Sequence, residues 1–95
     1  MGWVKAKLGG DLTGVTLRQV PLEADVLTWE QGASDPPVRI RLENCPLVGG
    51  ILPVDLFDPT ASTGLAHVET VGCYSAADNG RLADFQAIIL GTVEV

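Results

Sequence analysis

The residues best suited to acid–base or metal chemistry in this sequence are His67 and its acidic neighbours. His67 is the only histidine, and on a strand it would share one face with Glu69, two positions further on. Two such side chains supply at most two metal ligands, whereas a zinc site needs three or four, and no Cys-x-x-Cys or His-x-x-x-His pair completes the set. Asp55 and Asp58 lack the dense acidic spacing of a calcium loop. We therefore expect no metal and no other cofactor, and a half-exposed strand histidine at position 67.

Two serines and a glycine pair are the remaining candidates for chemistry. Ser62 and Ser75 are possible nucleophiles, but neither lies in a nucleophile elbow or in the sequence context of a triad. Gly49-Gly50 precedes an expected strand, whereas a phosphate-binding loop leads into a helix N-terminus. A tight turn or bulge explains the glycine pair better. We expect that the protein is not an enzyme.

The two cysteines, Cys45 and Cys73, indicate a reducing compartment. No signal peptide is expected, because Lys5 and Lys7 interrupt the start of the chain, and no apolar run is long enough to cross a bilayer. We predict two reduced, buried thiols in a protein made in the cytoplasm. A disulfide is the alternative, and it would require the two Cα atoms to lie within about 7 Å of each other.

The charge of this 95-residue chain is unevenly distributed. Twelve acidic and six basic residues give a net charge of −6, which argues against direct binding of nucleic acid. Residues 1–22 nevertheless hold three basic residues against one acid, while residues 23–95 hold three arginines against eleven acids. The N-terminal segment, residues 1–14, is therefore predicted to be an arm that lies on an acidic neighbour, such as the next copy of the protein. The alternative is a strand with solvated charges. If the arm exists, removal of residues 1–8 should weaken assembly and leave the fold largely intact.

Alternation with a period of two residues runs through most of the chain. Its clearest instance is "VRIRLEN", where Val38, Ile40 and Leu42 should point inward and the two arginines outward. Further strands are expected at 3–8, on both sides of Pro21, at 51–57, at 65–76 and from Phe85 onward, and no internal repeat is recognised. The prediction is a single all-β domain over residues 1–95, a small barrel or sandwich of about six or seven short strands with an N-terminal arm.

Three turn signals accompany these strands. Pro53 lies inside the expected strand 51–57 and indicates an edge strand or a bulge. Asp58, Pro59 and Gly64 suit the N-cap, the first position and the C-terminal stop of one helical turn. Asn79-Gly80 is the pair preferred by a two-residue type I′ hairpin.

The segments "GGILPVDLFDPTAST" and "AHVETVGCYSA" are similar to the capsid decoration (cement) proteins of tailed bacteriophages. The resemblance covers about the C-terminal half of the chain, and the positions that carry it are Gly50, Ile51, Leu52, Asp55, Asp58, Gly72 and Tyr74. It implies a structural protein of the virion, assembled in the host cytoplasm, that self-associates as a homotrimer on the major capsid protein without touching nucleic acid or membrane. The interface residues expected on this basis are Trp3, Lys5 and Lys7 in the arm, Leu52, Pro53 and Phe57 in an apolar patch, and Asp58 at the start of an exposed loop that extends to Gly64.

A second resemblance leads to a different function. The segments "ADVLTWEQ", "VRIRLEN", "GILPVDLF", "AHVETVG" and "RLADFQAIIL" follow the five-strand order of small OB-fold subunits of single-strand-binding complexes. This implies an adaptor in an intracellular soluble complex with nucleic acid. Those subunits end in a helix that makes the partner interface, whereas this sequence ends in "GTVEV".

Overall fold

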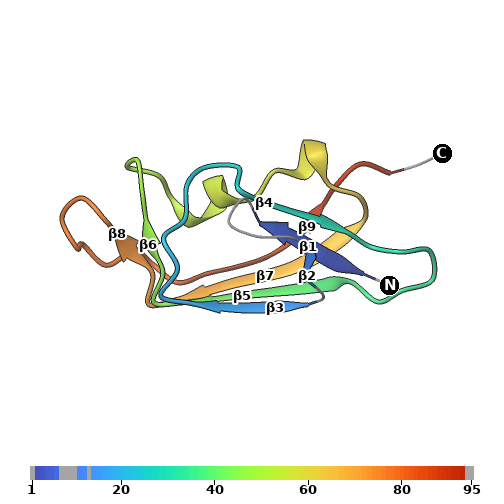
Figure 1. Cartoon of the computed structure of the whole chain (residues 1–95), viewed down its shortest axis with the longest axis horizontal. Helices are drawn as coiled ribbons and strands as arrows, with labels where there is room; N and C mark the ends of the chain where they lie inside the picture. Colours follow the sequence, from blue (N-terminus) through green and yellow to red (C-terminus); the bar gives the residue numbers. More distant parts are fainter. Residues whose placement is uncertain (1, 7–10, 13, 94–95) are drawn as a thin grey trace.

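Strands dominate the architecture of this protein (Figure 1). The structure is a computed structural model that describes residues 2–6, 11–12 and 14–93. Its largest sheet has the order β3-β5-β7-β9, in which β3, β5 and β7 are parallel and β9 is antiparallel to β7. These four strands are β3 (Val15–Arg18), β5 (Val38–Glu43), β7 (Leu65–Val71) and β9 (Phe85–Leu90).

Two smaller sheets complete the fold. A three-stranded antiparallel sheet has the order β2-β1-β4, and β6 pairs with β8 in parallel. Their strands are β1 (Trp3–Ala6), β2 (Asp11–Leu12), β4 (Leu27–Glu30), β6 (Pro46–Leu47) and β8 (Tyr74–Ser75). The only helical segments among the described residues are two 3-10 turns, η1 (Pro53–Leu56) and η2 (Pro59–Ala61). The prediction of a small all-β domain is confirmed, but the barrel is wrong: β3 and β9 are the two ends of an open sheet in the described chain.

The core lies between the four-stranded sheet and the layer that carries β1, β4 and η1. In β5 the predicted alternation is confirmed, because Val38, Ile40 and Leu42 are at most 4% exposed while Arg39 is exposed. Aromatic packing joins the two layers. The Phe57 ring stacks on Phe85 and meets Trp29 edge-on, at centroid distances of 6.4 and 6.5 Å.

The three parallel strands end in equivalent corners. These corners form a structural repeat that was not predicted from the sequence. Each strand is followed by a residue in the left-handed conformation: Gln19 (φ 55°), Asn44 (φ 53°) and Gly72 (φ 66°). Gln19 N–H donates to the Glu43 carbonyl at 3.0 Å, and Asn44 N–H donates to the Val71 carbonyl at 2.8 Å. The segments "LRQVPL", "LENCPL" and "TVGCYS" therefore lie in register one above another. The first two segments share Leu-x-x-x-Pro-Leu, but the third shares only a cysteine with the second, and β3 to β5 is a shift of 25 residues whereas β5 to β7 is a shift of 28.

Glycine suits the corner after β7. A Cβ atom at Gly72 would lie 2.3 Å from Oδ1 of Asn44 in the neighbouring corner, so the Asn44 side chain would have to move, and glycine adopts the positive φ without strain, although Gln19 and Asn44 adopt a similar φ in the other two corners. The close approach of successive corners thus accounts for this glycine.

Pro53 does not lie in a strand, contrary to prediction. Its fixed φ suits the first position of a helical turn, and it begins η1. The Asp55 carboxylate accepts the Leu52 N–H at 3.0 Å and closes that turn. The prediction of a helical turn that begins at Asp58 and stops at Gly64 is confirmed in part. Asp58 is the N-cap of η2 and accepts the Thr60 N–H at 3.1 Å, but the turn ends at Ser62 rather than at Gly64.

The hairpin around Asn79-Gly80 is longer than predicted. Tyr74 pairs with Arg81, and Ser75 N–H donates to the Gly80 carbonyl at 2.9 Å. Four residues lie between Ser75 and Gly80, so the two-residue type I′ turn is wrong. Asn79 has a positive φ of 59°, but its N–H donates back to the Ser75 carbonyl at 2.8 Å, which gives a wider loop.

The start of the chain belongs to the folded domain. Strand β1 pairs with β4 at four successive positions, and Val4 is fully buried in the core. The backbone of Trp3 and Lys5 therefore lies within a sheet, while Lys7 is outside the described residues. Residues 3–6 are not arranged as an arm that leaves the domain, because their ladder and the Val4 side chain complete the layer that covers the core.

This placement reverses the expected effect of shortening the chain. We predict that deleting residues 1–8 lowers the melting temperature strongly, and that Val4→Ala lowers the free energy of unfolding by about 2 kcal/mol through lost burial and a residual cavity. Val54→Ala, at a side chain that is 48% exposed, is the matched control and should change stability by less than about 0.5 kcal/mol. Thermal melts followed by circular dichroism measure the melting temperature, and denaturant unfolding measures the free energy of unfolding. A deletion variant as stable as the full chain would show that β1 is dispensable.

Candidate functional site

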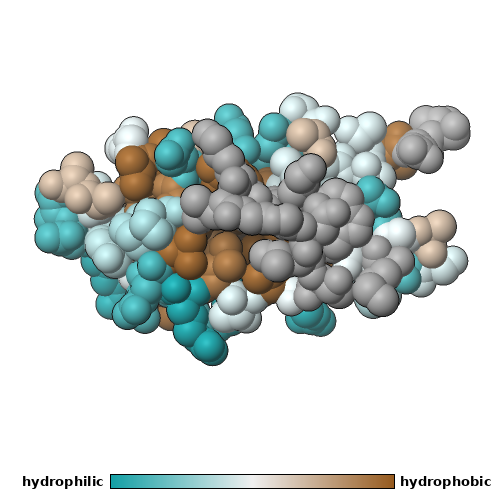
Figure 2. Space-filling model, in the orientation of Figure 1, coloured by the Kyte–Doolittle hydropathy of each residue, from teal (hydrophilic) through white to brown (hydrophobic). Residues whose placement is uncertain are grey.

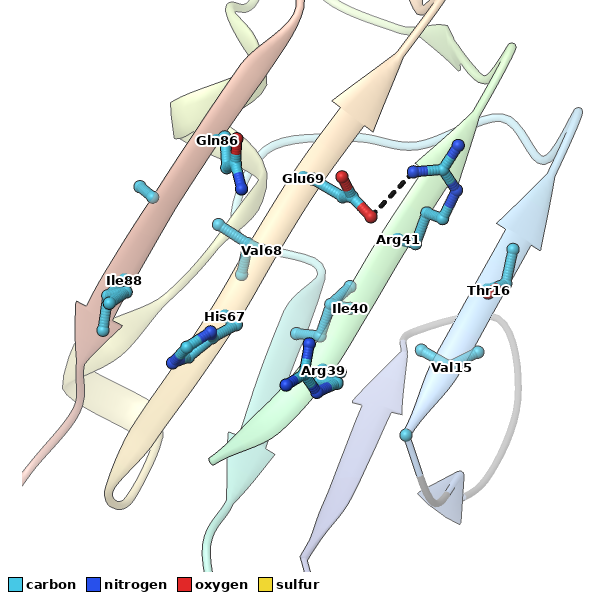
Figure 3. Close-up of a pocket in the computed structure, with 12 residues that line it drawn as sticks. Val15, Thr16, Arg39, Ile40, Arg41, His67, Val68, Glu69, Gln86 and Ile88 are labelled. Atoms are coloured by element: carbon cyan, nitrogen blue, oxygen red, sulfur yellow. Dashed lines mark ion pairs between the residues drawn. The ribbon is translucent and has the colours of Figure 1, made fainter. Parts of the chain in front are cut away.

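The outer face of the four-stranded sheet forms a groove of about 740 Å³ (Figure 3). Because strand side chains alternate between the two faces of a sheet, the residues between the buried positions of β5 and β7 all point into this groove. Its principal side chains are Thr16, Arg39, Arg41, His67, Glu69 and Ile88.

Strand register arranges these side chains in rows across the sheet. Arg39 lies opposite His67, which in turn lies opposite Ile88, and these three form the first row. Arg41, Glu69 and Gln86 form the second. Residues directly opposite on neighbouring strands are close enough to interact, so the side chains of each row form a continuous strip across the sheet.

The second row belongs to a ladder of ion pairs. Arg41 contacts Glu69 at 2.7 Å and Glu43 at 3.3 Å, and Glu43 also pairs with Arg18. The hydrogen bond and charge of Glu69 are the main reason why the pKa of Arg41 is raised. The hydrogen bond from Arg18 is the main reason why the pKa of Glu43 is lowered. The charges along this part of the face compensate one another.

Arg39 is the exception on this face. In the described part of the chain it makes no ion pair, and its nearest row neighbours are an imidazole and an isoleucine. Arg39 and Arg41 against Glu69 leave one positive charge in the groove of a protein whose net charge is −6. The groove therefore offers an uncompensated guanidinium, which favours an anionic partner group.

Exposed aliphatic side chains share this sheet face with the guanidinium, two strands away on β9. Ile88 is 63% exposed and Leu90 is 55% exposed, and both lie on the outer face of β9. Val93, just beyond the strand, is 59% exposed. The outer face thus combines one free charge with an apolar strip, as the surface of a docking site does.

His67 lies where the sequence predicts, half-buried on the same face as Glu69. The Glu69 carboxylate, however, is held by Arg41. Among the described residues, no three or more His, Cys, Asp and Glu side chains come together as a metal site would require. Ser62 is buried in a structural role: its hydroxyl donates to the Asp58 carbonyl at 2.6 Å and accepts the Trp29 N–H at 3.2 Å.

The apolar patch predicted from Leu52, Pro53 and Phe57 is not assembled on the surface. Only Leu52 is exposed, at 58%, whereas Phe57 is 4% exposed and Pro53 is buried. The 3-10 turn directs Pro53 inward, and the bridge between Leu27 and Phe57 draws the phenylalanine into the core. Asp58 is half-buried as the cap of η2. The other exposed large hydrophobic residues in this part of the sequence are Val48 and Val54.

The two cysteines occupy equivalent positions in successive corners, one residue after Asn44 and Gly72. Both thiols are free and buried, as predicted. The Cys45 thiol donates to the Leu17 carbonyl at 3.5 Å, and the Cys73 thiol donates to the Leu42 carbonyl at 3.9 Å. Burial is the main cause that raises the pKa of Cys73. Their location indicates packing rather than reactivity.

We compared the chain with known proteins. No protein-family model matches it, and neither a search of curated proteins nor a search of solved structures found a match.

The sequence indicated the direction of Arg39 and Arg41 but not their role. Alternation in "VRIRLE" places both arginines outward, and alternation in "FQAIIL" places Ile88 and Leu90 together on one face of β9. The order of β5, β7 and β9, which places Arg39, His67 and Ile88 in one row, comes only from the sheet topology.

Glu43 should make stability depend on pH in the acidic range. A carboxylate whose pKa is lowered on folding stabilises the protein above its unfolded pKa of about 4.3, and this contribution disappears as the pH falls through the lower native pKa. We therefore predict that Glu43→Gln lowers the melting temperature at pH 7, and that the difference from the wild type vanishes at about pH 2.5. Thermal melts at the two pH values check this. Asp78→Asn, in the exposed loop 76–80, is the control and should show no such convergence.

The thiols should react slowly in the folded protein. Burial of both side chains and the raised pKa of Cys73 predict slow modification by a thiol-specific reagent at pH 8, and two fast equivalents after unfolding in guanidinium chloride. Absorbance of the released thiolate gives the rates. Rapid labelling of either cysteine in the native protein would contradict this placement.

Proposed function

We propose that the protein is a structural, non-enzymatic assembly protein whose outer sheet face is covered by another protein subunit. The observation that carries this proposal is the uncompensated Arg39 on the same sheet face as the exposed Ile88 and Leu90, with His67 between Arg39 and Ile88. A solvated sheet face normally carries polar residues, and an exposed apolar strip on the same face as an unpaired charge fits a contact surface.

The edge of the sheet supports the same proposal. Strand β9 has no neighbour beyond it among the described residues, and its six residues, FQAIIL, contain no charge, no proline and no glycine. Isolated domains protect such edges with Lys, Pro or bulges, because an open edge invites pairing with another chain. Contact with a further subunit is one way to remove that hazard.

The partner follows from the resemblance to capsid decoration proteins. On that basis the protein is part of a virion, self-associates as a homotrimer, and binds the major capsid protein after assembly in the host cytoplasm. The small size and the amphipathic outer face are compatible with this role. The described chain contains no helix that is long and apolar enough to span a membrane.

Self-association is tested by light scattering coupled to size-exclusion chromatography at concentrations up to about 1 mM, where even weak interfaces are populated. We predict an oligomer for the wild type. Ile88→Lys should shift it to the 10.0 kDa monomer, because this change places a charge in the apolar strip. Ala83→Lys, at an exposed position that belongs to neither the sheet face nor the loop 48–55, should leave the oligomer unchanged. A wild type that stays monomeric throughout would remove the self-association part of the proposal, and one that also fails to bind shells would defeat the whole.

Attachment to a shell is tested separately. Where a major capsid protein is encoded in the same genome, cosedimentation with its empty shells should bring the wild type into the pellet. The Ile88→Lys variant should remain in the supernatant. Equal recovery of both proteins in the supernatant would remove the capsid part of the proposal.

A further inference from the structure

We infer that the surface which covers the outer sheet face belongs to a second copy of this chain, namely its acidic turn. The acidic turn consists of Asp25, Val48, Leu52, Val54 and Asp55. This inference rests on the proposed function and names the partner surface for it.

The acidic turn is one surface built from two segments. Asp25 N–H donates to the Asp55 carbonyl at 2.9 Å, and Val48 N–H donates to the Leu22 carbonyl at 2.8 Å, so residues 22–25 lie along residues 48–55. Both aspartates are exposed, and neither segment contains Lys or Arg. Leu52, Val54 and Val48 are exposed by 58%, 48% and 41%. In Figure 2, apolar side chains gather left of centre, over β6 and the loop that follows it.

The exposed large hydrophobic residues of the described chain fall into two groups, and the charges near them are opposite. Three belong to the acidic turn. The other three, Ile88, Leu90 and Val93, lie on or just beyond β9, and the unpaired Arg39 shares a row with the first of them. Apolar groups flanked by complementary charges are the composition expected of two surfaces that dock on each other.

The two surfaces lie on opposite sides of the four-stranded sheet. The inward residues of β5 share one core with Leu56 of η1, so η1 covers the inner side, while Arg39 projects from the other side. Figure 1 shows η1 and η2 together on one side of the four-stranded sheet, the side on which the core lies. One molecule cannot bring its own two surfaces together, whereas two molecules can.

Contact between two different surfaces of the same chain has a consequence for symmetry. Such a contact is heterologous, so a pair of copies still has one free turn and one free face for further copies. Addition continues until a ring closes or a fibre forms. A closed ring of three copies is the form consistent with the proposed homotrimer.

The test uses two variants that each block one surface. Leu52→Lys disrupts the turn, and Ile88→Lys disrupts the face. We expect each variant alone to be monomeric, with self-association at least tenfold weaker than in the wild type. An equimolar mixture should form a 1:1 dimer of about 20 kDa, twice the 10.0 kDa chain, because the intact turn of one variant can dock on the intact face of the other. Light scattering measures the mass, and circular dichroism establishes that both variants are folded.

The charges provide a second, independent measurement. Arg39→Glu and Asp25→Lys should each weaken association, and the double variant should recover it, because the reversed charges again attract. Because the φ of residue 25 is 56°, a lysine there could strain the backbone, and Asp25→Asn is the second variant that avoids this strain. Asp25→Asn should weaken association less than the charge reversal does. Arg81→Glu, at an exposed arginine paired with Asp84 away from the groove, is the matched control and should leave association unchanged.

The outcomes separate this inference from the proposal on which it rests. If the wild type associates but Leu52→Lys associates equally well, or if the mixture stays monomeric, the acidic turn is not the occupant and the assembly role stands. If the face binds only the capsid protein, the isolated wild type stays monomeric while shells still bind it, and the inference is overturned. A wild type that neither associates nor binds shells overturns both.

Discussion

The in-register stacking of three parallel strands is the constraint on which the rest of this structure depends. Strands β3, β5 and β7 end in the same left-handed corner, and the backbone bonds between corners hold Gln19, Asn44 and Gly72 one above another. Because register and corner are shared, every inward position of one strand faces an inward position of the next. The buried cross-strand pairs Ile40–Val68 and Leu42–Thr70 follow from this arrangement.

The same register also organises the outer face. Side chains at matching positions form rows, so opposite charges in the second row neutralise each other while the first row holds an arginine, a histidine and an isoleucine. An unpaired charge beside exposed aliphatic groups costs little in an isolated monomer, because water solvates the guanidinium. It becomes favourable when a partner supplies a carboxylate and apolar atoms at once. The open sheet therefore provides both the core of the domain and a surface suited to assembly.

Individual strands could be predicted where one face is buried and the other is solvated. The alternation in residues 38–43 predicts β5 with its inward and outward residues, and Asp58-Pro59 predicts the cap of η2, because both signals act within a few residues. Pro53 shows the limit of such signals. Proline at a strand edge and proline at the start of a helical turn have similar local sequences, and the Asp55 carboxylate that accepts the Leu52 N–H decides between them here. The stacked corners could not be predicted from the sequence, because backbone hydrogen bonds, rather than a set of side chains shared by all three segments, define the repeat.

Local patterns were sufficient to predict the all-β character, the inward and outward sets of β5, and two buried thiols, since burial periodicity and turn chemistry are encoded within a few residues. The folded structure was needed to show which strands are neighbours, that Val4 completes the core, that Phe57 is internal, and that Arg39 shares a row with Ile88. These relations depend on contacts between residues that are 20 to 50 positions apart. No local pattern specifies them, because the free energy of such pairing comes from the whole sheet and the shared core rather than from any one segment.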